Sequence, residues 1–157
     1  MYLEKFFYID QLVRKVNLFK KDNKIIGFTN GCFDLLHDGH LFLISNSRLF
    51  CDYLIIGLNS DLSVKNLKGK DRPIDNQNKR ILKLSKLNDV DAIILFSENT
   101  PFETIEKLKP DILFKGSDYL EKKIIGADIV INNGGKIKLI DILPGYSTTK
   151  IVNDLNK

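Results

Sequence analysis

The sequence has few cysteines and no long hydrophobic run. Cys32 and Cys51 are its only two cysteines in 157 residues, and they form no CxxC pair. A disulfide-stapled secreted scaffold does not fit this count, and both thiols are expected to be reduced. The longest wholly apolar run covers only residues 92–96, and charged residues interrupt the hydrophobic side chains of the first ten positions. Neither a membrane span nor a signal peptide fits, so we expect a cytoplasmic protein with no membrane partner.

Length and composition fit one globular domain. The chain has a mass of 18.0 kDa, 43% hydrophobic residues, four prolines and ten glycines, which excludes disordered and collagen-like chains. We therefore expect a single domain over residues 1–157, made of an N-terminal helix in 1–22 and a core in 24–155.

Positive charge is concentrated in one segment. The net charge is +4, yet residues 65–86 hold eight Lys and Arg against two Asp, which leaves the rest of the chain slightly acidic. Such a local patch suits a small polyanion such as nucleotide phosphates. A nucleic-acid surface would need a basic face with interleaved aromatic residues, which this sequence lacks, so no nucleic-acid partner is expected.

Short β-rich runs alternate with amphipathic segments along the chain. The runs predict strands over 25–29, 53–58, 90–96, 112–115 and 136–140. Apolar spacing predicts helices over 3–19, 41–49, 76–87, 101–108, 123–131 and 147–155, with a lysine-rich loop at 65–72. This alternation is typical of an α/β fold with a doubly wound, parallel five-stranded sheet. A ligand is expected at the carboxyl ends of the strands, where the strand order reverses.

Both histidines of the chain lie around Gly39, where the loop after the first predicted strand turns into a helix. A helix start offers unpaired N–H groups and a positive dipole end, so His37 and His40 are placed to donate hydrogen bonds to phosphate oxygens. Gly39 lets a phosphate approach the backbone closely. Two alternatives stay open. Cys32 and the two histidines could bind zinc, although no fourth ligand follows at a standard spacing, or both histidines could be structural.

Residues 28–40 read Phe-Thr-Asn-Gly-Cys-Phe-Asp-Leu-Leu-His-Asp-Gly-His, which resembles the HxGH signature of the nucleotidyltransferase superfamily with its Rossmann-like fold. Further blocks resemble the D-glycero-β-D-manno-heptose 1-phosphate adenylyltransferases; they lie at residues 59–61, 63–69, 72–73, 80, 115–119, 133–135 and 145–149. The resemblance covers 24–155 as a catalytic core. It implies an enzyme that uses ATP and heptose 1-phosphate to make ADP-heptose and pyrophosphate, a step toward lipopolysaccharide.

The glycerol-3-phosphate cytidylyltransferases are the nearest competing family, because they are similar in size and share the HxGH loop and a Ser-Thr-Thr helix start. They carry an Arg-Thr-x-Gly-Ile-Ser-Thr block, whereas residues 142–148 here read Ile-Leu-Pro-Gly-Tyr-Ser-Thr. Loss of that bidentate phosphate donor argues against this family. A cytidylyltransferase acting on glycerol 3-phosphate or another phosphorylated acceptor stays the alternative. A non-catalytic nucleotide-binding module is weaker, because it has no use for two histidines and a lysine-rich segment around the phosphates.

The resemblance also implies partners. Fused members of the heptose family carry a sugar kinase domain upstream, whereas only a helix precedes the core here, so we expect a stand-alone enzyme with a separate sugar kinase. Members of the superfamily are commonly dimers, so we expect a homo-oligomer, and specifically a dimer. Mg²⁺ is expected to be held mainly by the ATP triphosphate, because the sequence shows no carboxylate cluster with metal-ligand spacing.

The resemblance assigns roles to individual residues. The catalytic set that meets the phosphates is expected to be His37, His40 and Lys65. The sugar-phosphate side is expected to use Asp34 toward sugar hydroxyls, with Arg72 and Arg80 toward phosphate. The nucleotide is expected to contact Asn30, Gly31, Cys32, Phe33, Gly39, Lys68, Lys115, Gly116, Asp118, Ser147 and Thr148. No general base is expected, because a sugar phosphate is already an anionic nucleophile.

Overall fold

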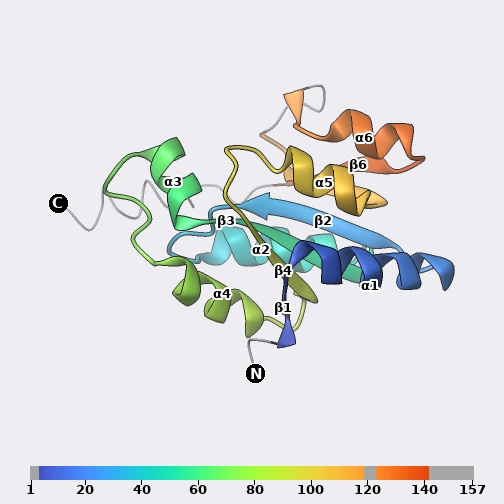
Figure 1. Ribbon diagram of the computed structural model, residues 1–157, viewed down its shortest axis with the longest axis horizontal. Helices are drawn as coiled ribbons and strands as arrows, with labels where there is room; N and C mark the ends of the chain where they lie inside the picture. The colour runs from blue at the N-terminus through green and yellow to red at the C-terminus, as the bar shows by residue number, and fades with distance from the viewer. Residues whose placement is uncertain (1–3, 119–122, 142–157) are drawn as a thin grey trace.

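Strands and helices alternate along the chain in the computed structural model, which describes residues 4–118 and 123–141. In chain order the elements are β1 (Phe6–Phe7), α1 (Ile9–Lys21), β2 (Ile26–Gly31), α2 (Asp38–Arg48), β3 (Tyr53–Asn59), α3 (Asp61–Lys68), α4 (Gln77–Ser85), β4 (Ala92–Phe96), α5 (Phe102–Leu108), β5 (Ile112–Gly116), α6 (Ala127–Asn132) and β6 (Lys136–Ile140) (Figure 1). The helix predicted over 147–155 lies outside the described residues. No helix within them is long and apolar enough to cross a membrane.

The strands form one parallel sheet in the order β1-β4-β3-β2-β5-β6. The predicted parallel α/β fold is confirmed, but the described residues contain six strands where five are predicted. From β2 the chain proceeds through β3 and β4 in one direction and through β5 and β6 in the other, so the strand order reverses between β2 and β5. β2 pairs with β3 along six residues but with β5 at only two, Gly27 and Phe28. The two strands that flank the reversal therefore lose their pairing toward their carboxyl ends.

Alternating side chains of the strands build a core on each face of the sheet. Tyr53 and Ile55 of β3 pack with residues of α1, α5 and α6, whereas Leu54, Ile56 and Leu58 pack with residues of α2 and α4. Figure 1 shows α1 in front of the sheet and α2 behind it. Because both faces are covered, all seven residues of β3 are buried, which explains the nearly continuous apolar run in the sequence.

The N-terminal segment corrects the predicted helix over 3–19. Phe6 and Phe7 form strand β1, which pairs with β4 and supplies the sixth strand at the edge of the sheet. The helix begins only at Ile9, because Tyr8 has an extended backbone (φ −84°, ψ 156°). The helical periodicity predicts too long a helix here, because two adjacent apolar residues fit a short strand as well as one face of a helix.

The lysine-rich segment predicted as a loop at 65–72 also needs correction, because its first four residues belong to helix α3. Ser60 caps this helix by accepting a hydrogen bond from the Ser63 N–H at 3.2 Å. Val64 is fully buried against the sheet and anchors the helix. The lysine-rich stretch alone does not indicate a helix, because the capping residue Ser60 and the buried residue Val64 both precede Lys65.

Gly27 in β2 has no room for a side chain. A Cβ at this position would lie 2.6 Å from Phe114 Cε2 and 2.7 Å from Cys51 Sγ. We expect Gly27→Ala to lower the free energy of unfolding in urea by about 1–3 kcal/mol through overpacking. Lys24→Ala, at an exposed position, is the control and should change it by less than about 0.5 kcal/mol. Equal stability of Gly27→Ala and the wild type would contradict this packing.

Candidate functional site

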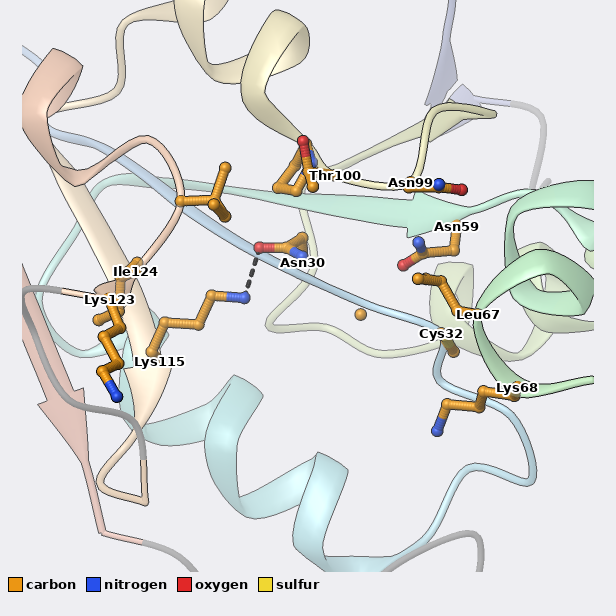
Figure 2. A pocket seen from close by; sticks show the side chains of 13 residues that line it. Asn30, Cys32, Asn59, Leu67, Lys68, Asn99, Thr100, Lys115, Lys123 and Ile124 are labelled. Carbon is orange, nitrogen blue, oxygen red and sulfur yellow. Dashed lines mark hydrogen bonds between the residues drawn. The ribbon is translucent and has the colours of Figure 1, made fainter.

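The reversal of strand order between β2 and β5 opens a pocket at the carboxyl end of the sheet, where a ligand crevice is expected. The pocket has a volume of about 340 Å³. It is lined by Asn30, Gly31, Cys32, Asn59, Leu67, Lys68, Asn99, Thr100, Pro101, Lys115, Lys123, Ile124 and Ile125 (Figure 2). We call it the switch-point pocket. It takes residues from the ends of β2, β3 and β5, from α3, and from the segments that precede α5 and α6.

Lys115 reaches across the gap between β5 and β2. Its Nζ donates a hydrogen bond of 2.6 Å to Asn30 Oδ1 inside the pocket (Figure 2). Burial lowers the pKa of Lys115 to about 8, and the Asp118 carboxylate opposes this shift. Lys115 is thus still mainly cationic at neutral pH. An anion that enters the pocket would restore much of the stabilisation that the ammonium group loses on leaving water.

The loop after β2 ends in a reciprocal cap that two histidines form at the start of α2. His37 is the N-cap residue, and its Nδ1 accepts a hydrogen bond from the Gly39 N–H at 3.1 Å. His40 Nδ1 accepts one from the His37 N–H at 3.3 Å, and the two rings stack with their centroids 3.7 Å apart. A neutral imidazole carries a single N–H, so using both Nδ1 atoms as acceptors assigns the proton to Nε2 of each ring. The cap therefore prepares two Nε2–H donors side by side.

Burial keeps these imidazoles neutral. It lowers the pKa of His40 to about 3, and the nearby His37 and Lys68 act in the same direction. It also lowers the pKa of His37, against the opposing effect of Asp38. The histidines can thus donate hydrogen bonds at neutral pH without contributing charge. Positive charge near this loop comes from lysines and from the N-terminus of α2.

A buried carboxylate holds the loop between β2 and α2 in a strained conformation. Phe33 and Leu35 have φ angles of +46° and +51°, which side chains other than glycine rarely adopt. Asp34, between them, is only 1% exposed. It accepts hydrogen bonds from the backbone N–H groups of Ile74 and Asp75, both at 2.9 Å, and from Arg72 Nε at 3.0 Å. Burial alone would raise the pKa of Asp34, but these hydrogen bonds hold it below its ordinary value. The structure thus places Asp34 in the interior, where it fixes the loop, and its predicted contact with sugar hydroxyls stays a prediction.

Arg80, predicted to contact phosphate, is instead buried in the wall of the switch-point pocket. Its side chain is 0% exposed. Nη1 donates to the main-chain oxygens of Cys32 and Asn59 at 2.8 and 2.6 Å, and Nε donates to that of Asp75 at 3.0 Å. Nη2 pairs with Asp61 Oδ1 at 2.7 Å. The guanidinium is therefore committed to protein acceptors and does not present itself to a ligand.

Lys65 and Arg72 lie in a second pocket of about 540 Å³, between α3 and the segment that leads to α4. The structure does not bring Lys65 into the switch-point pocket, because it lies on another part of the α3 surface from Lys68. Arg72 is held by Asp34, and among the described residues its buried Nη2 has no hydrogen-bond partner. The predicted catalytic role of Lys65 and the phosphate contact of Arg72 thus stay predictions.

The predicted nucleotide-binding residues fall into three groups. Asn30, Gly31, Cys32, Lys68 and Lys115 line the switch-point pocket. Four others lie on adjoining elements. Gly39 is in the first turn of α2 and Phe33 in the loop before it, whereas Gly116 is the last residue of β5 and Asp118 follows two residues later. The Phe33 ring packs on His40 with its centroid 5.1 Å away. Ser147 and Thr148 lie outside the described residues.

Several pocket residues escape the sequence reasoning. They are Asn59, Leu67, Asn99, Thr100, Pro101, Lys123, Ile124 and Ile125. A signal exists for Asn59, Asn99 and Thr100, because they lie at or shortly after the carboxyl ends of β3 and β4, the same edge of the sheet as Asn30. Asn59 and Leu67 also lie in the motif blocks 59–61 and 63–69, but no role in the site is predicted for them. For residues 123–125 the sequence carries no such signal, since their place depends on how α6 packs.

Metal ligation finds no support in the described part of the chain. Within residues 4–118 and 123–141, no group of three His, Cys, Asp or Glu side chains is placed to hold a metal ion. The zinc alternative of Cys32 with the two histidines therefore has no geometric basis among these residues.

A parallel sheet with a lysine-lined pocket at its switch point and neutral histidine donors at an adjoining helix start defines a nucleotide-handling α/β domain of the Rossmann type. The sequence model of the cytidylyltransferase-like family matches residues 28–153, and the chain belongs to that family. This confirms the resemblance drawn from the motifs.

Curated relatives extend the comparison. The chain is 47% identical over 144 residues to the bifunctional protein HldE of Hyphomonas neptunium, which covers 92% of this chain and 30% of that protein. It is 50% identical over 127 residues to the bifunctional protein HldE of Rhodopseudomonas palustris, which covers 81% of this chain and 26% of that protein. The chain thus spans less than a third of the length of these relatives.

Solved structures agree on the fold. A lipopolysaccharide core biosynthesis protein from Thermoplasma volcanium has 30% identity and a TM-score of 0.62, with 76% of this chain and 97% of that chain covered. A pantoate-β-alanine ligase from Francisella tularensis has 18% identity and a TM-score of 0.63, with 96% of this chain and 76% of that chain covered. The second likeness concerns the fold alone.

The histidine cap predicts a pH response. We expect ¹⁵N NMR to show Nε2 protonated and Nδ1 unprotonated in both rings, with His40 not titrating between about pH 5 and 8, because its pKa is lowered to about 3. The unfolded chain, with an ordinary pKa near 6.5, binds the proton first. The contribution of His40 to the free energy of unfolding is therefore fully present above about pH 6.5 and is lost as the pH drops, by about 2 kcal/mol between pH 7 and 5.

His40→Asn is the matched control for this pH response. Its side-chain oxygen can still accept the hydrogen bond from the His37 N–H, but it carries no titrating ring. Urea denaturation should show a shallower loss of stability at low pH for this variant than for the wild type. Parallel curves for the two proteins would contradict the buried, neutral state of His40.

Proposed function

We propose that the chain transfers AMP from ATP to D-glycero-β-D-manno-heptose 1-phosphate, giving ADP-heptose and pyrophosphate. The observation that carries the proposal is the 47% identity to a bifunctional protein HldE over 92% of the chain. Two observations support it. The motif blocks resemble the heptose 1-phosphate adenylyltransferases, and a related structure is that of a lipopolysaccharide core biosynthesis protein.

In the proposed reaction an anionic phosphate oxygen of the sugar attacks the α-phosphorus of ATP. The new P–O bond forms while the bond from the α-phosphorus to the α,β-bridging oxygen breaks, and pyrophosphate leaves opposite the attacking oxygen. The nucleophile is already ionised, so no side chain needs to remove a proton. What the protein must supply is alignment of the two substrates and stabilisation of the phosphate charge.

The residues of the site suit these two tasks. The His37 and His40 Nε2–H groups would donate to phosphate oxygens at the N-terminus of α2, where the helix dipole also favours negative charge. Lys68 and Lys115 would neutralise phosphate charge within the switch-point pocket. Asn30, which already holds Lys115, would fix the position of that charge. Lys68 and Lys115 line this pocket and Lys65 does not, so we assign the neutralisation of phosphate charge in it to Lys68 and Lys115. The catalytic role of Lys65 stays a prediction.

Mg²⁺ would accompany ATP as its counter-ion and withdraw charge from the leaving pyrophosphate. Its ligands would come mainly from the triphosphate and water. The proposal includes a sugar kinase in the pathway that supplies the sugar 1-phosphate. That kinase is either a separate protein or, as the name of the bifunctional relatives leaves open, another part of the same polypeptide. A homodimer and a cytoplasmic location, where ATP is abundant, belong to the same proposal.

Loss of an Nε2–H donor should slow turnover. We expect His40→Asn and His40→Ala each to reduce kcat in a pyrophosphate-release assay by about a hundredfold, because a positioned donor to developing charge contributes on the order of 3 kcal/mol. His40→Asn retains an acceptor for the His37 N–H and should therefore keep its thermal stability at pH 8. Full turnover of His40→Asn would contradict the assignment.

Substrate choice is tested by crossing ATP and CTP with heptose 1-phosphate and glycerol 3-phosphate. We expect pyrophosphate release only from ATP with heptose 1-phosphate. The family match is to cytidylyltransferase-like proteins, so CTP with glycerol 3-phosphate is the specific alternative. Turnover with that pair would overturn the substrate while leaving the phosphate chemistry in place. No turnover in any combination would contradict the proposed reaction.

A further inference from the structure

We propose that Arg80 is a positioning residue that sets the shape of the switch-point pocket for nucleotide and does not itself touch phosphate. The inference rests on the proposed function in one respect, namely that this pocket binds the nucleotide. It replaces the sequence-based role of Arg80 as a phosphate ligand.

Arg80 contacts the sheet at the point where the pairing of β2 with β3 ends. The last registered pair between β2 and β3 is Gly31 with Leu58, so Cys32 and Asn59 are the next residues along the two strands. Arg80 Nη1 donates to the carbonyl oxygens of both, at 2.8 and 2.6 Å. One buried nitrogen thus holds the two strands together immediately beyond their backbone ladder. Both residues that it holds line the pocket.

The planar peptide bond couples each carbonyl that Arg80 holds to the next backbone N–H. Fixing the carbonyl of Cys32 also fixes the N–H of Phe33, which points the opposite way across the same peptide. Phe33 has a positive φ of 46°, a strained conformation that persists only when surrounding interactions such as this hydrogen bond stabilise it. The carbonyl of Asn59 fixes the N–H of Ser60 in the same way, and that N–H donates to Phe96 O at 2.9 Å. Arg80 therefore orients backbone groups on two sides of the pocket.

Helix α3 connects Arg80 to Lys68 of the pocket. Nη2 pairs at 2.7 Å with Asp61, the first residue of α3. Lys68 is the last residue of the same helix and lines the pocket. A short helix transmits the position of its first turn to its last turn almost rigidly, so the Arg80 contact helps to place Lys68.

Two simpler roles for Arg80 make different predictions. A role through charge alone would be kept by lysine, which is cationic but cannot reproduce the planar fork of hydrogen bonds to separate acceptors. A role in stability alone would lower the unfolding temperature without changing the affinity for nucleotide. Positioning predicts that lysine fails and that nucleotide affinity falls in a protein that is still folded.

The test is Arg80→Lys, with ATP binding measured by isothermal titration calorimetry and turnover measured by pyrophosphate release. We expect the Kd for ATP to rise about tenfold and kcat/KM for ATP to fall about a hundredfold, the scale of loss for a misplacement near 1 Å. An unchanged Kd and kcat/KM in the folded variant would overturn the proposal.

Arg48→Lys is the matched control. Arg48 also joins two segments, with Nη1 donating to Cys51 O at 2.6 Å and Nε paired with Asp91 at 2.9 Å. These partners lie just before β3 and β4, at the amino ends of the strands and away from the pocket. We expect this variant to lose thermal stability with ATP affinity within twofold of the wild type, roughly the scatter expected for a distant site. An equal loss of ATP affinity in both variants would mean that general loosening of the fold, not positioning, explains the Arg80 result.

Asp61→Ala decides the question if Arg80→Lys does not fold. The Asp61 side chain is 41% exposed, so its loss is tolerable, and it removes the anchor of Arg80 on α3. A purely electrostatic effect predicts tighter ATP binding, because one negative charge near the pocket disappears. Positioning predicts weaker binding, about threefold or more, given the tenfold expected for Arg80→Lys. Tighter or unchanged binding would overturn the proposal.

The two proposals fail in different ways. ATP binding needs no acceptor, so a wild-type chain that binds ATP without making ADP-heptose would contradict the proposed reaction and leave the Arg80 comparison intact. A wild-type chain that makes ADP-heptose while Arg80→Lys binds ATP normally would contradict the Arg80 inference alone. A wild-type chain that binds neither ATP nor CTP would contradict both.

Discussion

The functional site depends on the separation of β2 from β5. In a parallel sheet the backbone ladder satisfies the strands only while they stay paired, and β2 keeps six registered pairs with β3 but only two with β5. Beyond Phe28 the two strands must find other partners, and the Lys115–Asn30 hydrogen bond spans the gap. The pocket is the space that this separation leaves. The start of α2, the strained loop before it and the N-terminus of α3 all border the same edge because each follows the end of a neighbouring strand.

Two buried charged residues connect the segments that border that edge. Asp34 and Arg80 are almost fully buried, and each is surrounded by hydrogen-bond partners from segments distant in sequence. Ion pairs of this kind contribute little net stability, because desolvation offsets most of the attraction. Removing one member would nevertheless leave the other groups unsatisfied, which is costly. Their effect is to stabilise one conformation of the loop. The positive φ angles at Phe33 and Leu35 make this conformation intrinsically unfavourable.

The sequence predicts the parallel α/β architecture because its signals are local: apolar runs mark strands such as β3, and the His37–His40 pair marks a helix start. It does not predict β1, because a two-residue strand has no periodicity and depends on pairing with β4. The roles of Asp34 and Arg80 are equally hidden. The sequence suggests a contact with sugar hydroxyls for Asp34 and with phosphate for Arg80, whereas their burial depends on partners that lie elsewhere in the chain, such as Ile74 for Asp34 and Cys32 for Arg80. The sequence gives no reason to distinguish Lys65 from Lys68. Their different positions around helix α3 place Lys65 in the second pocket and Lys68 in the switch-point pocket.

The geometry also separates two tasks that a phosphate site must perform. The histidines are neutral donors whose orientation is fixed by their own capping hydrogen bonds, so they add direction without adding charge. The lysines supply charge, and burial makes the charge of Lys115 more favourable when an anion is present than when the pocket is empty. In the proposed reaction, fixed neutral donors would favour the arrangement of oxygens that fits them, so that binding would be stronger for the transition state than for substrate or product.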